Sequence, residues 1–226
     1  MQTGSQRRLA WHAALISVVI VGSPTMLLGG ASDTTVVLHV SAELRAPHSA
    51  AFPDTEFEIA GREARALLAT AGIPVELRDC RTAPSECEVS APGRVVISVR
   101  LRPGRKATDA TVCGEVARDY LDRPVVVVYL APHADLATAF RFHVASRSHP
   151  GLGEIRMGQL VGLTLAHEVA HWLGTPHAAS GVMKARPAVE EVIALASQRL
   201  AFDSDQGSRL QYALLQRSIA VVAANR

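Results

Sequence analysis

Residues His167 to His177 read HEVAHWLGTPH. We expect a fold that positions the side chains of this stretch. His167 and His171 are four residues apart. Side chains with this spacing on an α-helix lie on one face in adjacent turns. Two imidazole rings placed in this way can bind one metal ion, because zinc–nitrogen bonds are about 2.0–2.1 Å long. We therefore predict a helix that carries two metal ligands.

Three further residues of the stretch extend this prediction to a catalytic metal site. Glu168 follows His167 at about 100° around the helix, where its carboxylate can take a proton from a metal-bound water. Gly174 is expected to end the helix in a left-handed conformation, which lets the chain reverse and return His177 as a third ligand. Three protein ligands leave a fourth position open, as is typical of catalytic zinc. We predict Zn²⁺ as the cofactor and Glu168 as the general base.

The pattern HExxHxxGxxH followed by a methionine resembles the signature of the metzincin zinc peptidases. Met183 lies six residues after His177, in the segment SGVM that begins at Ser180. The resemblance implies that Met183 forms a hydrophobic floor beneath the metal and is not a ligand. It also implies a zincin-like fold and a peptide or protein substrate. Only residues 167–183 match at the level of a motif, and the match is closest to small bacterial metzincin-like proteins.

One departure concerns the transition state. No tyrosine closely follows Met183, so the sequence identifies no tyrosine that would stabilise the developing oxyanion, and Tyr212 is distant in the chain.

Two alternative functions compete with the metzincin interpretation. In a gluzincin peptidase the third ligand is a Glu on a later helix, and Glu190 and Glu191 lie about twenty residues after His171. The helix dipole alone also favours an acidic pair in the first turn of a helix. We therefore prefer to interpret Glu190 and Glu191 as such a pair and not as metal ligands. The second alternative is an inactive, zinc-stabilised binding module. Glu168 argues against that alternative, because a structural zinc site needs no adjacent base.

The first thirty residues are typical of a segment that directs export. Arg7 and Arg8 precede an apolar run, residues 9–28, and small residues follow at 29–32. This layout predicts a secretory signal peptide over residues 1–31, so the metallopeptidase domain would span 32–226 and be periplasmic or secreted. The alternative is a membrane anchor formed by residues 9–28.

The three cysteines fit an oxidising compartment. Cys80 and Cys87 flank a short polar loop and are candidates for a disulfide, which would leave Cys113 free. Pairing of Cys113 with either of the other two is equally compatible with the sequence.

Composition and periodicity define the fold class. Apolar residues make up 48% of the 226, which supports a sizeable core, and a net charge of +2 gives no case for binding nucleic acid. We expect a monomer.

Thr55 and Glu58 have the spacing of a capping box, and 103–116 is predicted to be a loop. The predicted strands are 34–40, 73–77, 94–101 and 125–130, and the predicted helices are 55–71, 134–144, 159–173, 187–200 and 208–224. This order predicts an α+β domain with a twisted, mostly parallel or mixed sheet of four to five strands, a backing helix, an active-site helix and C-terminal helices.

Overall fold

The computed structural model describes residues 34–42, 52–81, 87, 94–147 and 154–224. The predicted signal peptide, residues 1–31, and the alternative anchor, residues 9–28, lie outside this part of the chain. Among the helices that the structure describes, none combines the length and the apolar character that a membrane span requires.

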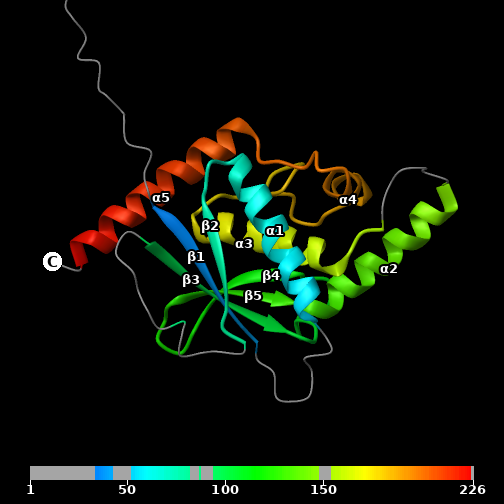
Figure 1. The fold of residues 1–226 in the computed structure, drawn as a ribbon, viewed down its shortest axis with the longest axis horizontal. Helices are drawn as coiled ribbons and strands as arrows, with labels where there is room; N and C mark the ends of the chain where they lie inside the picture. Colours follow the sequence, from blue (N-terminus) through cyan, green and yellow to red (C-terminus); the bar gives the residue numbers. More distant parts are fainter. Residues whose placement is uncertain (1–33, 43–51, 82–86, 88–93, 148–153, 225–226) are drawn as a thin grey trace, which may run out of the picture. The chain divides into compact units, whose positions relative to one another are not determined.

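The strands form one mixed five-stranded sheet, which confirms the α+β class (Figure 1). Their order across the sheet is β2-β1-β3-β5-β4, and every neighbouring pair is parallel except β4 and β5. The strands are β1 (Thr35–Ala42), β2 (Val75–Asp79), β3 (Arg94–Arg102), β4 (Gly114–Arg118) and β5 (Pro124–Tyr129).

The prediction that residues 103–116 are a loop is wrong at its end, because β4 begins at Gly114. This strand has the sequence GEVAR, which has one β-branched residue and no apolar alternation. Its existence depends on antiparallel pairing with β5, from Gly114 opposite Val128 to Arg118 opposite Pro124. Local sequence therefore contains little of the information that makes this segment a strand.

The helices lie where the hydrophobic periodicity predicted them, and their ends differ from the predicted ends by a few residues. The expected capping box of Thr55 and Glu58 is wrong. The residue that precedes the first helix is Pro53, and no side chain caps that end. The Pro53 carbonyl accepts hydrogen bonds from the backbone N–H groups of Glu56 and Phe57, so the helix starts one residue before Thr55. The helices are α1 (Asp54–Thr70), α2 (Leu130–Arg147), α3 (Met157–Trp172), α4 (Val189–Ala196) and α5 (Ser204–Ala224).

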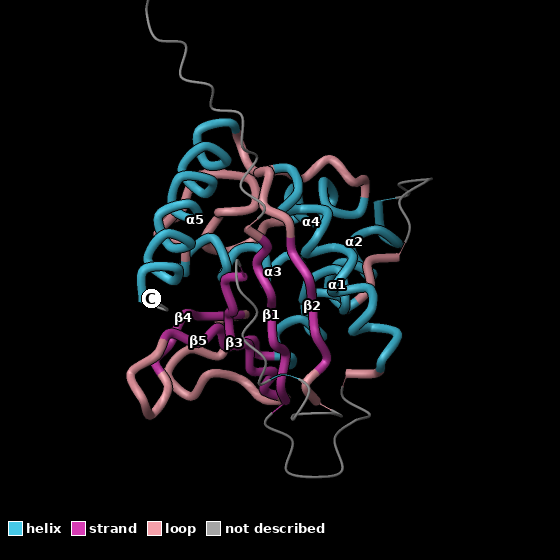
Figure 2. Tube along the Cα trace, turned by 60° about the vertical axis from the view of Figure 1, so that its left-hand side comes forward, coloured by secondary structure: helices cyan, strands magenta, loops and turns pink. Residues whose placement is uncertain are grey.

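Helices α1 and α3 pack directly against each other through small residues. A Cβ atom on Gly158 would lie 2.4 Å from the carbonyl oxygen of Glu56, and one on Gly162 would lie 2.7 Å from that of Ala60. These two glycines are four residues apart and so share one face of α3. Their lack of side chains lets the backbones of the two helices approach closely, which fixes α3 over the sheet (Figure 2).

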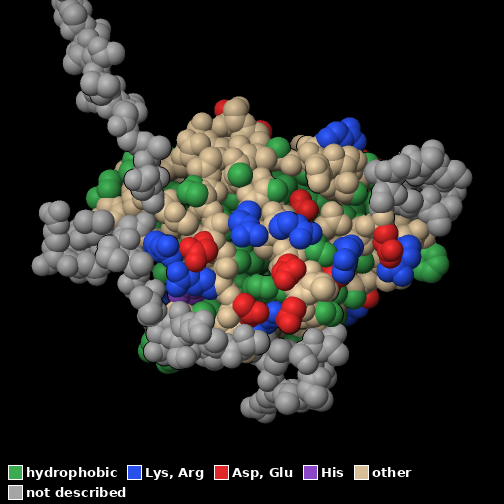
Figure 3. Space-filling model, viewed as in Figure 1, with side chains coloured by type: hydrophobic (Ala, Val, Ile, Leu, Met, Phe, Trp, Pro, Cys, Tyr) green, Lys and Arg blue, Asp and Glu red, His purple; other side chains and the backbone are tan. Residues whose placement is uncertain are grey.

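The main core lies between the sheet and its helices. Alternate residues of β3 and β5 point into it, and α1, α3, α4 and α5 contribute apolar side chains to it. The other residues of β5, Val125, Val127 and Tyr129, form a second, smaller cluster. This burial on both faces explains why the strand is almost entirely apolar. On the face shown in Figure 3, acidic and basic side chains are interspersed.

The structure joins Cys80 to Cys87 in a disulfide and leaves Cys113 free. The bond closes a short loop, because the two residues are seven apart in sequence. The entropy of closing such a loop in the unfolded chain predicts that Cys80→Ser with Cys87→Ser lowers the free energy of unfolding by about 2 kcal/mol. Urea denaturation measures this loss, and Cys113→Ser is the control. A disulfide-linked peptide that contains Cys113 would contradict this pairing.

Candidate metal centre

Helix α3 carries the first two histidines of the site and is buried almost throughout. The helix ends at Trp172, and Gly174 adopts a positive φ of 96°, as its position in the motif predicted. Backbone N–H groups of Gly174 and Thr175 donate to the carbonyls of His171 and Ala170, at 2.8 and 2.9 Å. The chain therefore turns tightly after α3.

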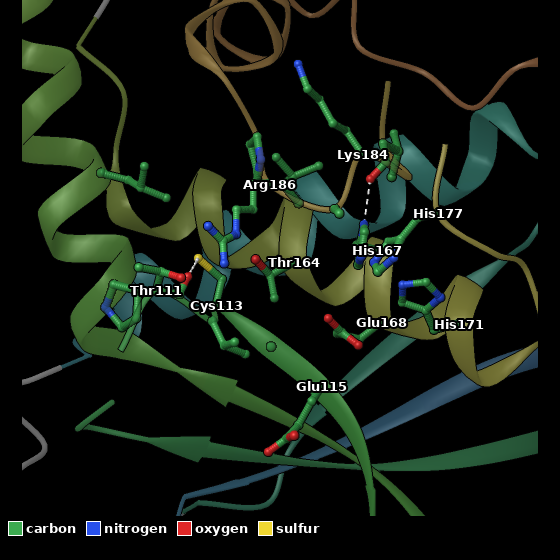
Figure 4. Close-up of a pocket in the computed structure, with 18 of the residues that line it drawn as sticks. Thr111, Cys113, Glu115, Thr164, His167, Glu168, His171, His177, Lys184 and Arg186 are labelled. Atoms are coloured by element: carbon green, nitrogen blue, oxygen red, sulfur yellow. Dashed lines mark hydrogen bonds between the residues drawn. The ribbon is translucent and has the colours of Figure 1, made fainter. Parts of the chain in front are cut away.

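The turn brings His177 beside His167 and His171 (Figure 4). Each ring offers one nitrogen to a group whose atoms all lie within 4.8 Å of one another. The ring centroids are 4.5 Å apart for His167 and His171, and 4.4 Å apart for His171 and His177. Three nitrogens this close together can hold one metal ion.

Backbone carbonyl groups set the orientation of two of the rings. His167 Nδ1 lies 2.8 Å from the carbonyl oxygen of Val182, and His171 Nδ1 lies 2.7 Å from that of Thr175. A carbonyl group only accepts hydrogen bonds, so each Nδ1 carries the proton and donates it. The Nε2 atoms therefore keep their lone pairs for a metal. Burial lowers the pKa of His167 to about 4, which favours the neutral, ligating form.

The segment after His177 folds into a tight turn that contacts His167 through the Val182 carbonyl, and we call residues 178–184 the Met-turn. Met183 is fully buried in the main core. Ala178 N donates to the Met183 carbonyl at 2.8 Å, and Lys184 N donates to that of Gly181 at 3.2 Å. Gly181 has a positive φ of 78°. The Met-turn is thus closed by its own backbone, and its Val182 carbonyl contacts His167.

Glu168 projects from α3 toward β4 and is 4% exposed (Figure 4). Burial raises the pKa of its carboxyl group to about 8. Glu115 adds to the rise, and Lys106 opposes it. Glu115 accepts hydrogen bonds from Lys106 and from Tyr129, the latter at 2.7 Å. A cation held by the histidines would stabilise the Glu168 carboxylate and lower this pKa. The carboxyl group is therefore placed to hold or release a proton.

Close contact with Gly114 fixes the position of Glu168. A Cβ atom on Gly114 would lie 2.6 Å from Thr164 Cγ2 and 2.9 Å from Glu168 Cγ. Only a residue without a side chain lets β4 approach α3 this closely at its first residue.

Gly114→Ala is expected to displace Glu168 or Thr164 and to lower the free energy of unfolding by about 1–3 kcal/mol, as overpacking does elsewhere. Gly104→Ala is the matched control, because a Cβ atom there meets nothing within 4 Å. Denaturant melts of the two variants measure the difference. Equal stability of both would mean that β4 does not press on α3.

A cleft of about 730 Å³ lies beside the three histidines. Its walls come from β4 and the preceding loop, from α2, from α3 and from the segment after the Met-turn. Leu136, Ala139 and Leu163 give part of it an apolar lining. At the rim, Arg105 pairs with Asp135, and Arg186 pairs with Asp109 at 3.4 Å.

Several residues of this site were not identified from the sequence. The sequence predicts a loop where Gly114 and Glu115 begin β4, so neither residue could be recognised as part of the site. Asp119 accepts hydrogen bonds from the backbone of Leu121 and Arg123 in the turn between β4 and β5. Asp119 and Asp122 are turn-forming residues that shortly precede the valines at 125–128. This pattern was the sequence signal for a hairpin here.

His133 lies outside the group of metal-binding side chains found among the described residues. His133 is fully buried and is hydrogen-bonded to the Tyr129 carbonyl and to Thr164 Oγ1, at 2.6 and 2.8 Å. It is therefore a satisfied core histidine. His39 lies on β1, and His143 lies in α2. His48 and His149 lie outside the described residues.

The acidic pair of the gluzincin alternative lies at the start of α4. Glu190 is exposed. Glu191 is buried, and its Oε2 accepts hydrogen bonds from Lys184 Nζ and from Ala188 N, both at 2.9 Å. Neither residue belongs to the group of metal-binding side chains found among the described residues.

No family model matches the chain, and no curated protein matches it. A solved structure titled "GM1 bound form of the ECX AB5 holotoxin" is similar to it at 11% sequence identity, with a TM-score of 0.42 over 80% of each chain. A likeness this weak carries no argument about fold or function.

Proposed function

We propose that this protein is a zinc-dependent endopeptidase of the metzincin type. The observation that carries the proposal is the convergence of His167, His171 and His177 on one point with Glu168 buried beside them. A purely structural metal site would be closed by a fourth protein ligand and would need no adjacent base. The buried Met183, in a turn whose Val182 carbonyl contacts His167, is consistent with the resemblance to metzincins.

The donor atoms suit zinc. Neutral imidazole nitrogens are ligands that zinc prefers, together with copper, iron and nickel, whereas calcium and magnesium prefer oxygen. Hydrogen bonds from both Nδ1 atoms on α3 to carbonyl groups are the arrangement that commonly orients histidine ligands. Three ligands would leave room for water or substrate.

The chemistry follows from the placement of Glu168. When bound, zinc supplies a Lewis acid that activates water and polarises the scissile carbonyl group. Glu168 accepts the proton of the attacking water and then delivers it to the leaving amine. Its burial excludes bulk water from these transfers. Glu115, held by Lys106 and Tyr129, raises the pKa of Glu168 and so makes its carboxylate a stronger base, while a cation held by the histidines would keep that carboxylate ionised before the transfer.

The cleft favours an extended peptide as substrate. Strand β4 is an edge of the sheet, paired with β5 on one side, and it lines the cleft. An unpaired strand edge can add a peptide through main-chain hydrogen bonds, largely independently of sequence. The apolar wall formed by Leu136, Ala139 and Leu163 would accept an apolar side chain of that peptide.

The proposal is tested by metal analysis and hydrolysis of the same preparation. We expect one zinc per chain by elemental analysis and cleavage of an unfolded protein substrate. A chelator should abolish the cleavage and lower the melting temperature, since a ligand that binds only the folded state stabilises it. Added zinc should restore both. Zinc binding without hydrolysis of any member of a broad peptide library would favour the binding module instead.

A further inference from the structure

Glu191 is a buried carboxylate whose contacts exceed those of a helix cap. Its side chain is 7% exposed. The hydrogen bond from Ala188 N satisfies one donor at the start of α4, as a capping residue does. The second partner, Lys184 Nζ, comes from outside the helix. The Lys184 side chain therefore joins the Met-turn to α4.

Lys184 is the last residue of the Met-turn and extends away from the three histidines (Figure 4). At the other end of the turn, Ala178 follows His177 directly and forms a β-bridge with Lys184. Between them, the Val182 carbonyl accepts the hydrogen bond from His167 Nδ1. A shift of the Met-turn would therefore move the acceptor that orients one metal ligand and the backbone that carries another.

We propose that Glu191 is a positioning residue of the metal site, which acts through Lys184 to hold the Met-turn against His167 and His177. This inference rests on the proposed zinc site. Lys184 is half-buried and Glu191 is buried, so their pairing is screened little by water. Loss of either partner leaves the other charge unpaired, which disfavours this conformation of the turn.

Zinc affinity, measured by competition with a chromophoric chelator, is the first test. Glu191→Gln keeps an oxygen to accept from Ala188 N but removes the charge that pairs with Lys184. Lys184→Met removes the other partner. Each variant is expected to weaken zinc binding about 10–100-fold, as changes around metal ligands do. Because the two residues act as one unit, the double variant should lose little more than either single one.

A spectroscopic readout separates positioning from simple destabilisation. The visible absorption spectrum of the Co²⁺-substituted protein reports ligand geometry and should change in Glu191→Gln and Lys184→Met. Lys184→Arg keeps the charge and should recover part of the affinity. Glu190→Gln, on the exposed neighbour in the same turn, is the matched control and should behave as the parent. Circular dichroism establishes that each variant is folded.

The possible outcomes are distinct. Parent-like zinc affinity and Co²⁺ spectra in folded Glu191→Gln and Lys184→Met would overturn the inference and leave the proposed function standing. Loss of stability with an unchanged metal site would show a helix cap only, and would overturn it too. If Glu191→Ala loses all zinc while His177→Ala keeps it, Glu191 is a ligand and not a positioning residue. A parent that binds no zinc overturns the proposed function together with the inference.

Discussion

Glu168→Gln is expected to reduce peptide hydrolysis by at least about 10²–10⁴-fold, the usual contribution of a general base. The amide has nearly the shape of the carboxyl group, so its contacts with Gly114 and the rest of the cleft wall remain. It cannot accept the proton of the attacking water. Because Glu168 is not among the three proposed metal ligands, zinc content should stay at the level of the parent.

Steady-state hydrolysis and elemental analysis of the same sample measure the effect of Glu168→Gln. Thr111→Ser, a conservative change elsewhere in the cleft lining, serves as the control and should keep most of the activity. Chelator-sensitive hydrolysis that survives in Glu168→Gln would contradict the mechanism, because the water would then need a different base.

His177→Ala is expected to weaken zinc binding by more than the 10–100-fold typical of changes around a ligand, because it removes a ligand itself. His177 lies on the exposed loop after Gly174, so the metal-free fold should survive the change, while stabilisation by added zinc should nearly disappear. Hydrolysis should fall with zinc occupancy.

Isothermal titration with zinc and thermal melting with and without the metal measure the effect of His177→Ala. Ser180→Ala is the control, on an exposed residue of the adjoining Met-turn. Full zinc affinity in His177→Ala would disprove the three-histidine site.

The site could be predicted from the sequence because most of it is local. The spacing of His167 and His171, the left-handed Gly174 and the early return of His177 are properties of eleven consecutive residues. Helical periodicity and turn chemistry operate over this range. The long apolar strands β3 and β5 were recognisable for the same reason.

What the sequence did not reveal depends on contacts between distant segments. Strand β4 exists through its pairing with β5, so Gly114 and Glu115 had no recognisable place before the sheet was known. Thr55 and Glu58 match the spacing of a capping box, but the helix begins at Asp54, directly after Pro53. Glu191 was expected as a first-turn acid, and its position in α4 agrees. Its pairing with Lys184 follows only from where the Met-turn lies.

The acceptors that orient His167 and His171 are main-chain carbonyl groups of Val182 and Thr175, and no side-chain substitution can remove them. A saturation scan of side chains at these two positions would therefore understate how much the loop backbone contributes. Transfer of the site to another scaffold has the same requirement. Grafting the three histidines and Glu168 alone would leave the imidazole rings free to rotate, whereas moving residues 167–184 as one continuous segment would transfer the acceptors as well.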